Sequence, residues 1–151
     1  MKSEKLKILF GVLCLMVIVS CNNTSPKSLT EKPINEDLKH QLEMTPKTMQ
    51  ELRKIGVTED KLLKVEFFFY TPKIEDARNL SEDLKKLNYD VDYRLGADTT
   101  TIEYVVTGLT TKLIMTDDAM IKWTKEMWEI GDKNHAEFDG WGTSPESEEF
   151  N

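Results

Sequence analysis

Few residues in this chain have the types and spacing needed for metal or acid–base chemistry. The two histidines, His40 and His135, lie far apart in the sequence. His135-Ala136-Glu137 matches only the first half of a zinc deaminase signature, because no Pro-Cys-x-x-Cys follows it. Asp90 and Asp92 are two positions apart, so on a strand they share one face and are typical of surface charge. These patterns predict a protein with no catalytic residues, no metal and no cofactor.

Other catalytic patterns are also missing from the sequence. It has no glycine-rich phosphate loop, and no serine or cysteine lies within a nucleophile signature. One alternative keeps an enzymatic role, as a small envelope enzyme whose site forms around His135, Asp139 and tyrosines. That alternative requires a cleft in which these groups come within hydrogen-bond distance of one another.

The most specific chemistry lies at the N-terminus. Met1–Lys7 is positively charged, and Ile8–Val19 is an apolar run of 12 residues, shorter than the roughly 20 helical residues that span a bilayer. This pattern predicts a signal peptide over residues 1–20. The run ends in Ile18-Val19-Ser20-Cys21, which resembles a bacterial lipobox. We therefore expect lipid on Cys21 and a membrane anchor in the cell envelope, on the periplasmic or surface face.

Composition divides the rest of the chain into three parts. Residues 21–44 are polar and mixed in charge, which predicts a flexible tether. Residues 45–146 carry the apolar periodicity of one folded domain, and residues 147–151 form an acidic tail. Both cysteines, Cys14 and Cys21, precede the domain, so it has no thiol for a disulfide or a thiolate metal site.

The charge of the chain favours a basic protein as its partner. The formal net charge is −7, and residues 1–20 contain three lysines and one acid, which leaves 17 basic and 26 acidic groups, or −9, in the remainder. Such a balance repels phosphate backbones, so we expect no direct binding of nucleic acid. An acidic surface attracts proteins with exposed Arg or Lys.

The strongest strand signal is Lys64–Thr71, which Pro72 ends because proline lacks an N–H and favours extended geometry before it. Successive side chains of a strand point to opposite faces. One face has Val65, Phe67 and Phe69, and the other has Glu66, Phe68 and Tyr70. Glu66 indicates that the second face is the more solvent-exposed one.

The remaining periodicity predicts helices and a hairpin. Apolar residues at steps of three and four indicate helices over about 46–55, 73–87 and 116–130, with Thr45 and Thr116 as N-caps. The segments 89–94 and 102–107 alternate as the two strands of a hairpin, and 137–143 supplies a final short strand or turn. Whether Gly108 is a bulge or a strand end, and whether 113–115 extends the pairing, stays open.

This order predicts an α+β fold of the ferredoxin-like type. In a β-α-β-β-α-β sandwich, an antiparallel sheet has both helices on one face, and the other face is left open. The helix over 46–55 precedes this unit as a short extra element.

Four segments resemble one protein family. They are Leu52–Gly56, Val65–Tyr70 with Pro72, Ala77 with Leu84–Val91, and Glu137–Thr143. Together they resemble the regulator of ribonuclease activity B family, the RraB-like ribonuclease E inhibitor domain, over about residues 45–146. The most specific match is the C-terminal motif that contains Asp139, Gly140, Trp141 and Gly142. The resemblance implies an α/β sandwich and a non-enzymatic protein that binds another protein and alters RNA decay.

The compartment and the resemblance point to different partners. Ribonuclease E works in the cytoplasm, whereas a lipidated Cys21 places the domain outside the inner membrane. The leading interpretation is a regulatory module that keeps the family's domain and binds another protein of the envelope. The alternative, a cytoplasmic inhibitor of ribonuclease E, requires that the N-terminus is not exported.

We expect the open face of the sheet to bind the partner. The residues predicted for this role are Phe68, Tyr70, Asp92, Arg94 and Glu103. Aromatic rings surrounded by acids suit a protein with exposed Arg or Lys, whereas RNA-binding sheets surround their aromatic residues with positive charge. The alternative is that the tether, the first helix or the acidic tail covers Phe68 and Tyr70.

The C-terminal motif has a structural and a functional interpretation. In the structural one, Gly140 and Gly142 adopt unusual backbone angles in a tight turn, and Trp141 closes the core under the helices. In the functional one, the segment Asp139–Trp141 contacts the partner.

Overall fold

The computed structural model describes residues 35–97 and 103–145, which belong to one compact unit. The helices are α1 (Glu36–Lys54), α2 (Ile74–Lys85) and α3 (Asp117–Lys133). The strands are β1 (Leu62–Leu63), β2 (Glu66–Thr71), β3 (Asp90–Leu95), β4 (Tyr104–Leu109), β5 (Leu113–Ile114) and β6 (Glu137–Gly142). The predicted signal peptide, Cys21 and the tail over 147–151 lie outside the described residues.

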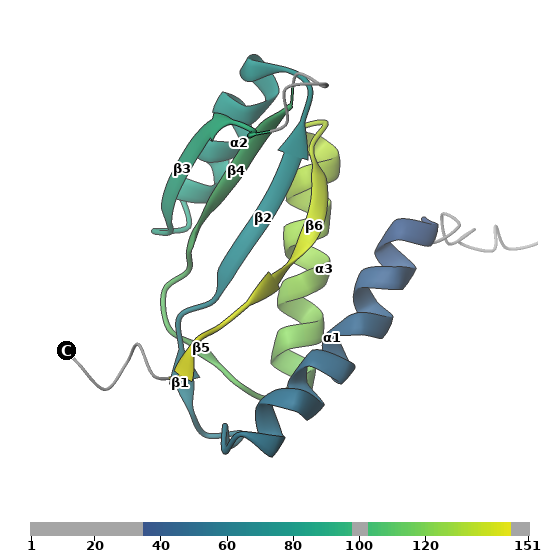
Figure 1. Ribbon diagram of the computed structural model, residues 1–151, viewed down its shortest axis with the longest axis vertical. Helices are drawn as coiled ribbons and strands as arrows, with labels where there is room; N and C mark the ends of the chain where they lie inside the picture. The colour runs from purple at the N-terminus through teal and green to yellow at the C-terminus, as the bar shows by residue number, and fades with distance from the viewer. Residues whose placement is uncertain (1–34, 98–102, 146–151) are drawn as a thin grey trace, which may run out of the picture. The chain divides into compact units, whose positions relative to one another are not determined.

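The main sheet has the strand order β3-β4-β2-β6, and all of its neighbours are antiparallel. β2 and β6 are adjacent although they lie far apart in the sequence, and α2 and α3 cover the same face of the sheet (Figure 1). This arrangement confirms the predicted α+β fold, a β-α-β-β-α-β unit preceded by a helix.

The core lies between this sheet and its two helices. Phe67 and Phe69 point into it from β2, and the ring of Phe69 lies 4.9 Å from that of Phe138 on β6. The helices contribute buried residues at steps of three and four. These are Ala77, Leu80 and Leu84 from α2, and Met120, Trp123 and Met127 from α3. The face of β2 that was expected to be apolar is therefore confirmed as the core face.

Helix α1 begins at Glu36, so the prediction of a helix that starts near residue 46 is wrong. Residues 36–44, predicted to belong to a flexible tether, are helical. The N-cap is Asn35, whose side chain accepts a hydrogen bond from the Asp37 N–H at 2.9 Å. Pro46 lies inside the helix, where the missing N–H removes one hydrogen bond of the backbone.

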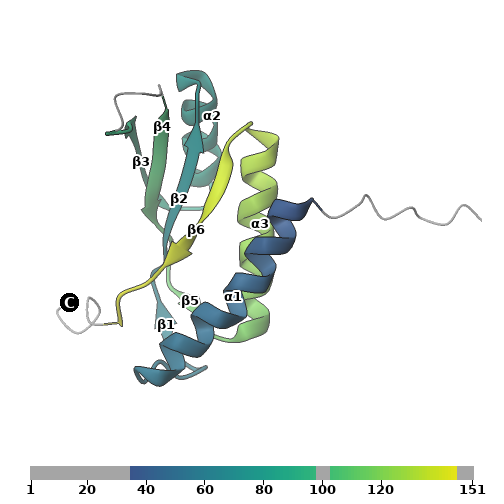
Figure 2. The same ribbon diagram turned by 45° about the vertical axis from the view of Figure 1, so that its right-hand side comes forward.

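Tertiary contacts of α1 compensate for that loss. The Thr45 and Thr124 hydroxyls are 2.9 Å apart in the interface with α3, and both residues are buried. At the start of the helix, the Trp128 Nε1 donates a hydrogen bond to the Asp37 carboxylate at 2.7 Å. Figure 2 shows α1 against α3, on the side away from the sheet.

The other two helices differ from the prediction only at their ends. α2 ends at Lys85 instead of 87, and Asn88 closes the turn in a left-handed conformation with φ 62°. Leu87 was expected on the apolar stripe but is exposed, because it lies beyond the helix. The predicted cap of α3 is confirmed, since the Thr116 hydroxyl accepts a hydrogen bond from the Ala119 N–H at 3.3 Å.

Two questions that the sequence left open have structural answers. Gly108 is neither a bulge nor a strand end, because it lies inside β4 and faces Phe67 on one side and Val91 on the other. Leu113–Ile114 forms β5, which pairs with β1 in a separate two-stranded sheet. The bulge of the main sheet lies in β6, where the register shifts opposite Phe68 and Phe69.

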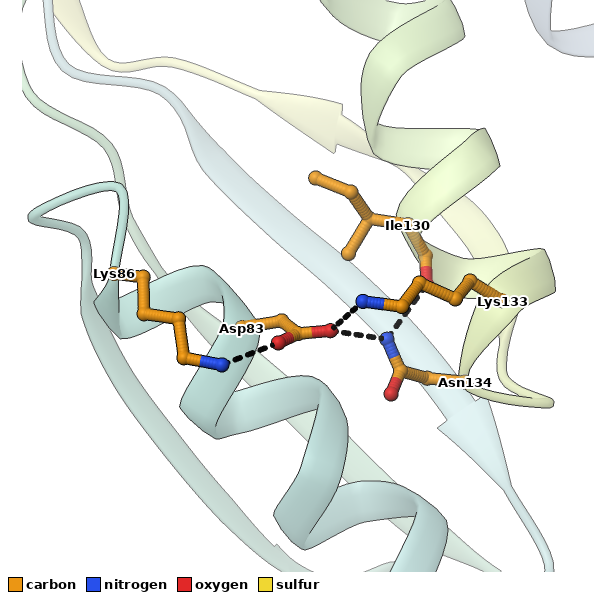
Figure 3. Close-up of polar contacts among 5 residues, drawn as sticks. All are labelled: Asp83, Lys86, Ile130, Lys133 and Asn134. Carbon is orange, nitrogen blue, oxygen red and sulfur yellow. Dashed lines mark hydrogen bonds and ion pairs between the residues drawn. The ribbon is translucent and has the colours of Figure 1, made fainter.

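A charged cluster joins α2 to the C-terminal end of α3 (Figure 3). The Asp83 carboxylate accepts hydrogen bonds from Lys133 and Lys86, both at 2.8 Å, and from the Asn134 side chain at 3.1 Å. These donors, with Lys133 contributing most, hold the pKa of Asp83 well below its usual range. The cluster is a structural link between the two helices.

Candidate protein-binding face

The sheet face opposite α2 and α3 carries the residues with the clearest binding chemistry. We call it the open face, and it consists of Glu66, Phe68, Tyr70, Asp90, Asp92, Arg94, Val105, Thr107, Leu109 and Glu137. In Figure 2 the described helices lie on the other side of the main sheet. The described helices therefore leave the open face uncovered.

Strand pairing arranges the open face in three rows across the sheet. In the central row, Phe68 lies opposite Thr107, which lies opposite Asp92. Directly opposite residues of antiparallel strands have Cβ atoms about 4.5–5.5 Å apart and share a face. Each row therefore forms a continuous strip of side chains.

The two outer rows also consist of directly opposite residues on neighbouring strands. Tyr70 is flanked by Glu137 on one side and by Val105 and then Arg94 on the other. In the remaining row, Glu66 is followed by Leu109 and Asp90. Aromatic and aliphatic groups thus occupy the two central strands, and most of the charge lies on the outer strands.

The charges of the open face are unbalanced. It carries four carboxylates, from Glu66, Asp90, Asp92 and Glu137, against the single guanidinium of Arg94. At its centre Phe68 and Tyr70 are half-buried, and Leu109 is 41% exposed. An apolar centre with an acidic surround is complementary to a protein surface that presents Arg or Lys.

The hydroxyl of Thr107 adds a polar feature to the central row. Its oxygen is buried and has no hydrogen-bond partner within the described part of the chain. An unpaired buried hydroxyl costs free energy.

The structure brings together four of the five predicted partner-binding residues. Phe68 and Asp92 share one row, and Tyr70 and Arg94 share the next. Glu103 lies outside these rows, just before β4, where its carbonyl accepts a hydrogen bond from the Gly96 N–H at 2.7 Å.

Helix α1 leaves the open face uncovered. It packs on α3, so the alternative in which the first helix covers Phe68 and Tyr70 is wrong. The predicted tether up to residue 34 and the tail beyond 145 lie outside the described residues.

Sequence reasoning missed three members of the open face, Thr107, Leu109 and Glu137. The alternation that places Val105 on this face extends to Thr107 and Leu109, and this signal could have identified both. Glu137 had no local signal, because its position depends on the pairing of β6 with β2.

Within the C-terminal motif, Trp141 packs toward the core. The ring of Trp141 contacts that of Trp123 edge-on at 6.1 Å, and its Nε1 donates a hydrogen bond to the Thr45 hydroxyl at 3.3 Å. Gly140 has a φ of 139° beside the bulge, as expected for a glycine there. Gly142 has no positive φ, so the prediction of an unusual backbone at that residue is wrong. Asp139 is exposed on β6.

The structure does not assemble the predicted enzymatic alternative. His135 is exposed in the turn after α3, with φ 54°. Two shallow hollows flank α1, and neither is lined by His135, Asp139 or a tyrosine. In residues 35–97 and 103–145, no three His, Cys, Asp or Glu side chains are placed to hold a metal ion.

The described helices also differ in character from membrane spans. Within the two described ranges, none is both long enough and apolar enough to cross a bilayer.

Comparison with known proteins adds one match. A family model described as "regulator of ribonuclease activity B" matches residues 42–143. No curated protein matches the chain. The matched range extends from within α1 to the end of β6, so it includes the whole open face.

Proposed function

The chain belongs to the regulator of ribonuclease activity B family, and on that basis we propose that it is a regulatory protein without catalysis of its own. It acts by binding a protein partner through the open face. The observation that carries this proposal is the row in which Phe68, Thr107 and Asp92 lie side by side, next to the row of Tyr70 and Arg94.

The chemistry of the open face defines the partner. A guanidinium or ammonium group that reaches the ring of Phe68 or Tyr70 gains roughly 0.5–1 kcal/mol from the π-system. Glu137 and Asp92 lie on either side to receive further cations. Central aromatic anchors dominate binding energy in most interfaces, and peripheral charges mainly set specificity and association rate. The partner is therefore a protein with clustered Arg or Lys.

We further propose that the protein works in the cell envelope, attached by lipid on Cys21. The support is the basic segment, the apolar run and the lipobox-like sequence that ends at this cysteine. Incorporation of labelled palmitate reports this modification. If the protein is located in the envelope, its partner is an envelope protein. The family's domain then acts in a different compartment from ribonuclease E.

The family match supports one alternative. If the N-terminus is not exported, the domain inhibits ribonuclease E in the cytoplasm, as the family resemblance implies. Cell fractionation separates these two settings, because the lipid-anchored form sediments with membranes and the alternative form stays in the cytosolic fraction.

Cross-linking in intact cells tests the binding face. The full-length protein is cross-linked to its neighbours, and captured proteins are compared with those of the double variant Phe68→Ala/Tyr70→Ala. We expect the variant to lose capture of a basic protein, because the two aromatic anchors are removed without touching the core. Capture by wild type should also weaken at high salt, since it depends on opposite charges.

The matched control is Ile55→Ala. Ile55 is 67% exposed at the end of α1, far from the open face, so its truncation removes exposed apolar surface without changing the rows. Its capture should equal that of wild type. Unchanged capture by the double variant would reject the open face as the binding surface.

A further inference from the structure

The two edges of the main sheet are unequal. At the β6 edge, the Phe138 carbonyl accepts a hydrogen bond from the Gln41 Nε2 at 2.9 Å. Gln41 comes from α1 and is itself 8% exposed. A backbone group that would otherwise be free to pair with another strand is therefore occupied by a side chain.

The β3 edge has no such protection. The Gly96 N–H donates to the Glu103 carbonyl at 2.7 Å, and the register continues as Leu95 opposite Tyr104 and Arg94 opposite Val105. Because antiparallel pairs alternate, the even-numbered residues of β3 bond to β4. The N–H and C=O groups of Val91, Tyr93 and Leu95 then point away from the sheet.

These outward groups are free within the described part of the chain. No hydrogen bond to another described residue is formed by the backbone of Val91, Tyr93 or Leu95 on that side. β3 is also free of bulges and prolines, and Figure 2 shows it at the margin of the sheet with no described element beyond it. It is a template for one more strand.

We propose that this added strand is the β3 of a second copy of the chain, paired antiparallel about Tyr93. The inference is independent of the partner proposed for the open face. Its basis is the sequence Asp90-Val91-Asp92-Tyr93-Arg94-Leu95, which is complementary to its own reverse around Tyr93. In this register each strand donates and accepts at Val91, Tyr93 and Leu95, so all of the outward groups are paired.

The charges select this register. With Tyr93 opposite Tyr93, Asp92 of each copy lies opposite Arg94 of the other, on the open-face side. Neither residue forms an ion pair with another described residue within its own copy. Sliding one strand by two residues places either Asp92 opposite Asp92, with Asp90 opposite Arg94, or Arg94 opposite Arg94, so each of these registers adds a like-charged pair that the Tyr93 register lacks.

The opposite face of the strand is complementary as well. There Leu95, which is 58% exposed in the single copy, lies opposite Val91 of the second copy. The two Tyr93 rings face each other. Pairing thus covers an exposed leucine and joins the two sheets into one.

A contact made by one short strand is small. Interfaces of that size fall at the weak end of specific association, so we expect pairs that dissociate on dilution. If both copies are held in one membrane, their local concentration rises and pairing is favoured.

Charge reversal on the full-length chain tests the proposal. Two copies with different tags are produced together, extracted in mild detergent, and scored for recovery of one tag with the other. We expect Asp92→Arg and Arg94→Asp each to weaken self-association about tenfold, because two attractive pairs become two repulsive ones. The double variant Asp92→Arg/Arg94→Asp should recover wild-type pairing, because it exchanges the two charges.

Mixing the two single variants is the decisive arm. Asp92→Arg and Arg94→Asp copies should pair with each other about as well as wild type, although each pairs with itself about tenfold more weakly, which also shows that both are folded. Asp90→Arg is the matched control, because Asp90 lies opposite Gly96 in this register, and its pairing should stay within about twofold of wild type. Undiminished self-pairing of either single variant, or no recovery in the mixture, overturns the proposal. If β3 instead accepts a strand of another protein, the mixture does not recover.

Discussion

Gly108 is a residue whose structural role cannot be read from its local sequence. In the sequence it follows an alternating strand, and it is compatible with a bulge or a strand end. In the structure it lies between β2 and β3, and a Cβ there would be 1.9 Å from the Asp90 carbonyl oxygen and 2.9 Å from the Phe67 ring. The need for glycine comes from two strands that pair only in the folded chain, so no local pattern predicts it.

We predict that Gly108→Ala destabilises the protein by about 1–3 kcal/mol or more. The added methyl group overlaps a backbone oxygen, which moves only if β3 moves. Thermal unfolding followed by circular dichroism measures this, and about 1 kcal/mol corresponds to a fall of roughly 4–8 °C in a small domain.

Gly142→Ala is the comparison for that experiment. No atom lies within 4 Å of a Cβ at Gly142, and its φ is not positive. Its effect should stay within about 0.5 kcal/mol. Equal stability of Gly108→Ala and wild type would show that β3 lies farther from β4 than the structure places it.

Helix α1 shows where a local signal and the folded element disagree. Thr45 before Pro46 has the pattern of a helix start, yet both residues lie at the middle of a longer helix. The Thr45 hydroxyl forms a hydrogen bond with the Thr124 hydroxyl and accepts another from the Trp141 Nε1. These tertiary contacts stabilise the helix beside the proline. The elements whose apolar spacing is long and regular, such as α3, could be predicted to within a few residues because no such competition occurs there.

The cluster around Asp83 predicts how the contact between α2 and α3 depends on pH. Its pKa is below the usual value of about 3.9, so the ionised carboxylate is favoured in the folded state. That contribution is fully present above about pH 4 and is lost as the pH falls through the lower, folded-state pKa. Asp83→Asn should therefore be less stable than wild type by roughly 1 kcal/mol at pH 7, and the difference should shrink at pH 3 and below.

Urea unfolding at pH 7 and at pH 3 measures both differences. Glu51→Gln is the matched change, because Glu51 pairs with Lys54 at 2.7 Å while both side chains are mostly exposed. An exposed pair of that kind contributes less than about 1 kcal/mol and is screened by salt. A constant difference between Asp83→Asn and wild type at both pH values would contradict the assigned role of the carboxylate.

At the scale of the whole molecule, the order of elements was enough to predict the sandwich, because a hairpin between two β-α units restricts the topology. The open face was predicted in part for the same reason, since Phe68 and Tyr70 alternate with core residues. The neighbours of these residues were not predictable from local pattern. Glu137 lies beside Tyr70 only through the pairing of β6 with β2, which joins the two ends of the domain.

The N-terminal segment yields a prediction for the entire chain. Cells fed labelled palmitate should label the wild-type protein, and Cys21→Ala should abolish the label, because only a thiol forms the thioether to the lipid. Cys14→Ala should keep it, which separates the two cysteines of the chain. An unlabelled wild type, or label retained by Cys21→Ala, would refute lipid attachment at that residue.

The side chain of Gln41 also affects how many copies of the chain can associate through their sheet edges. A sheet with two free edges is a bifunctional unit, and such units add to one another without limit, as they do in fibrils. Gln41 occupies the Phe138 carbonyl at the β6 edge, whereas among the described residues no side chain occupies the outward backbone groups of β3 in the same way. When the β3 strands of two copies pair as proposed, both β3 edges are used, and the β6 edge is less available to add a further strand.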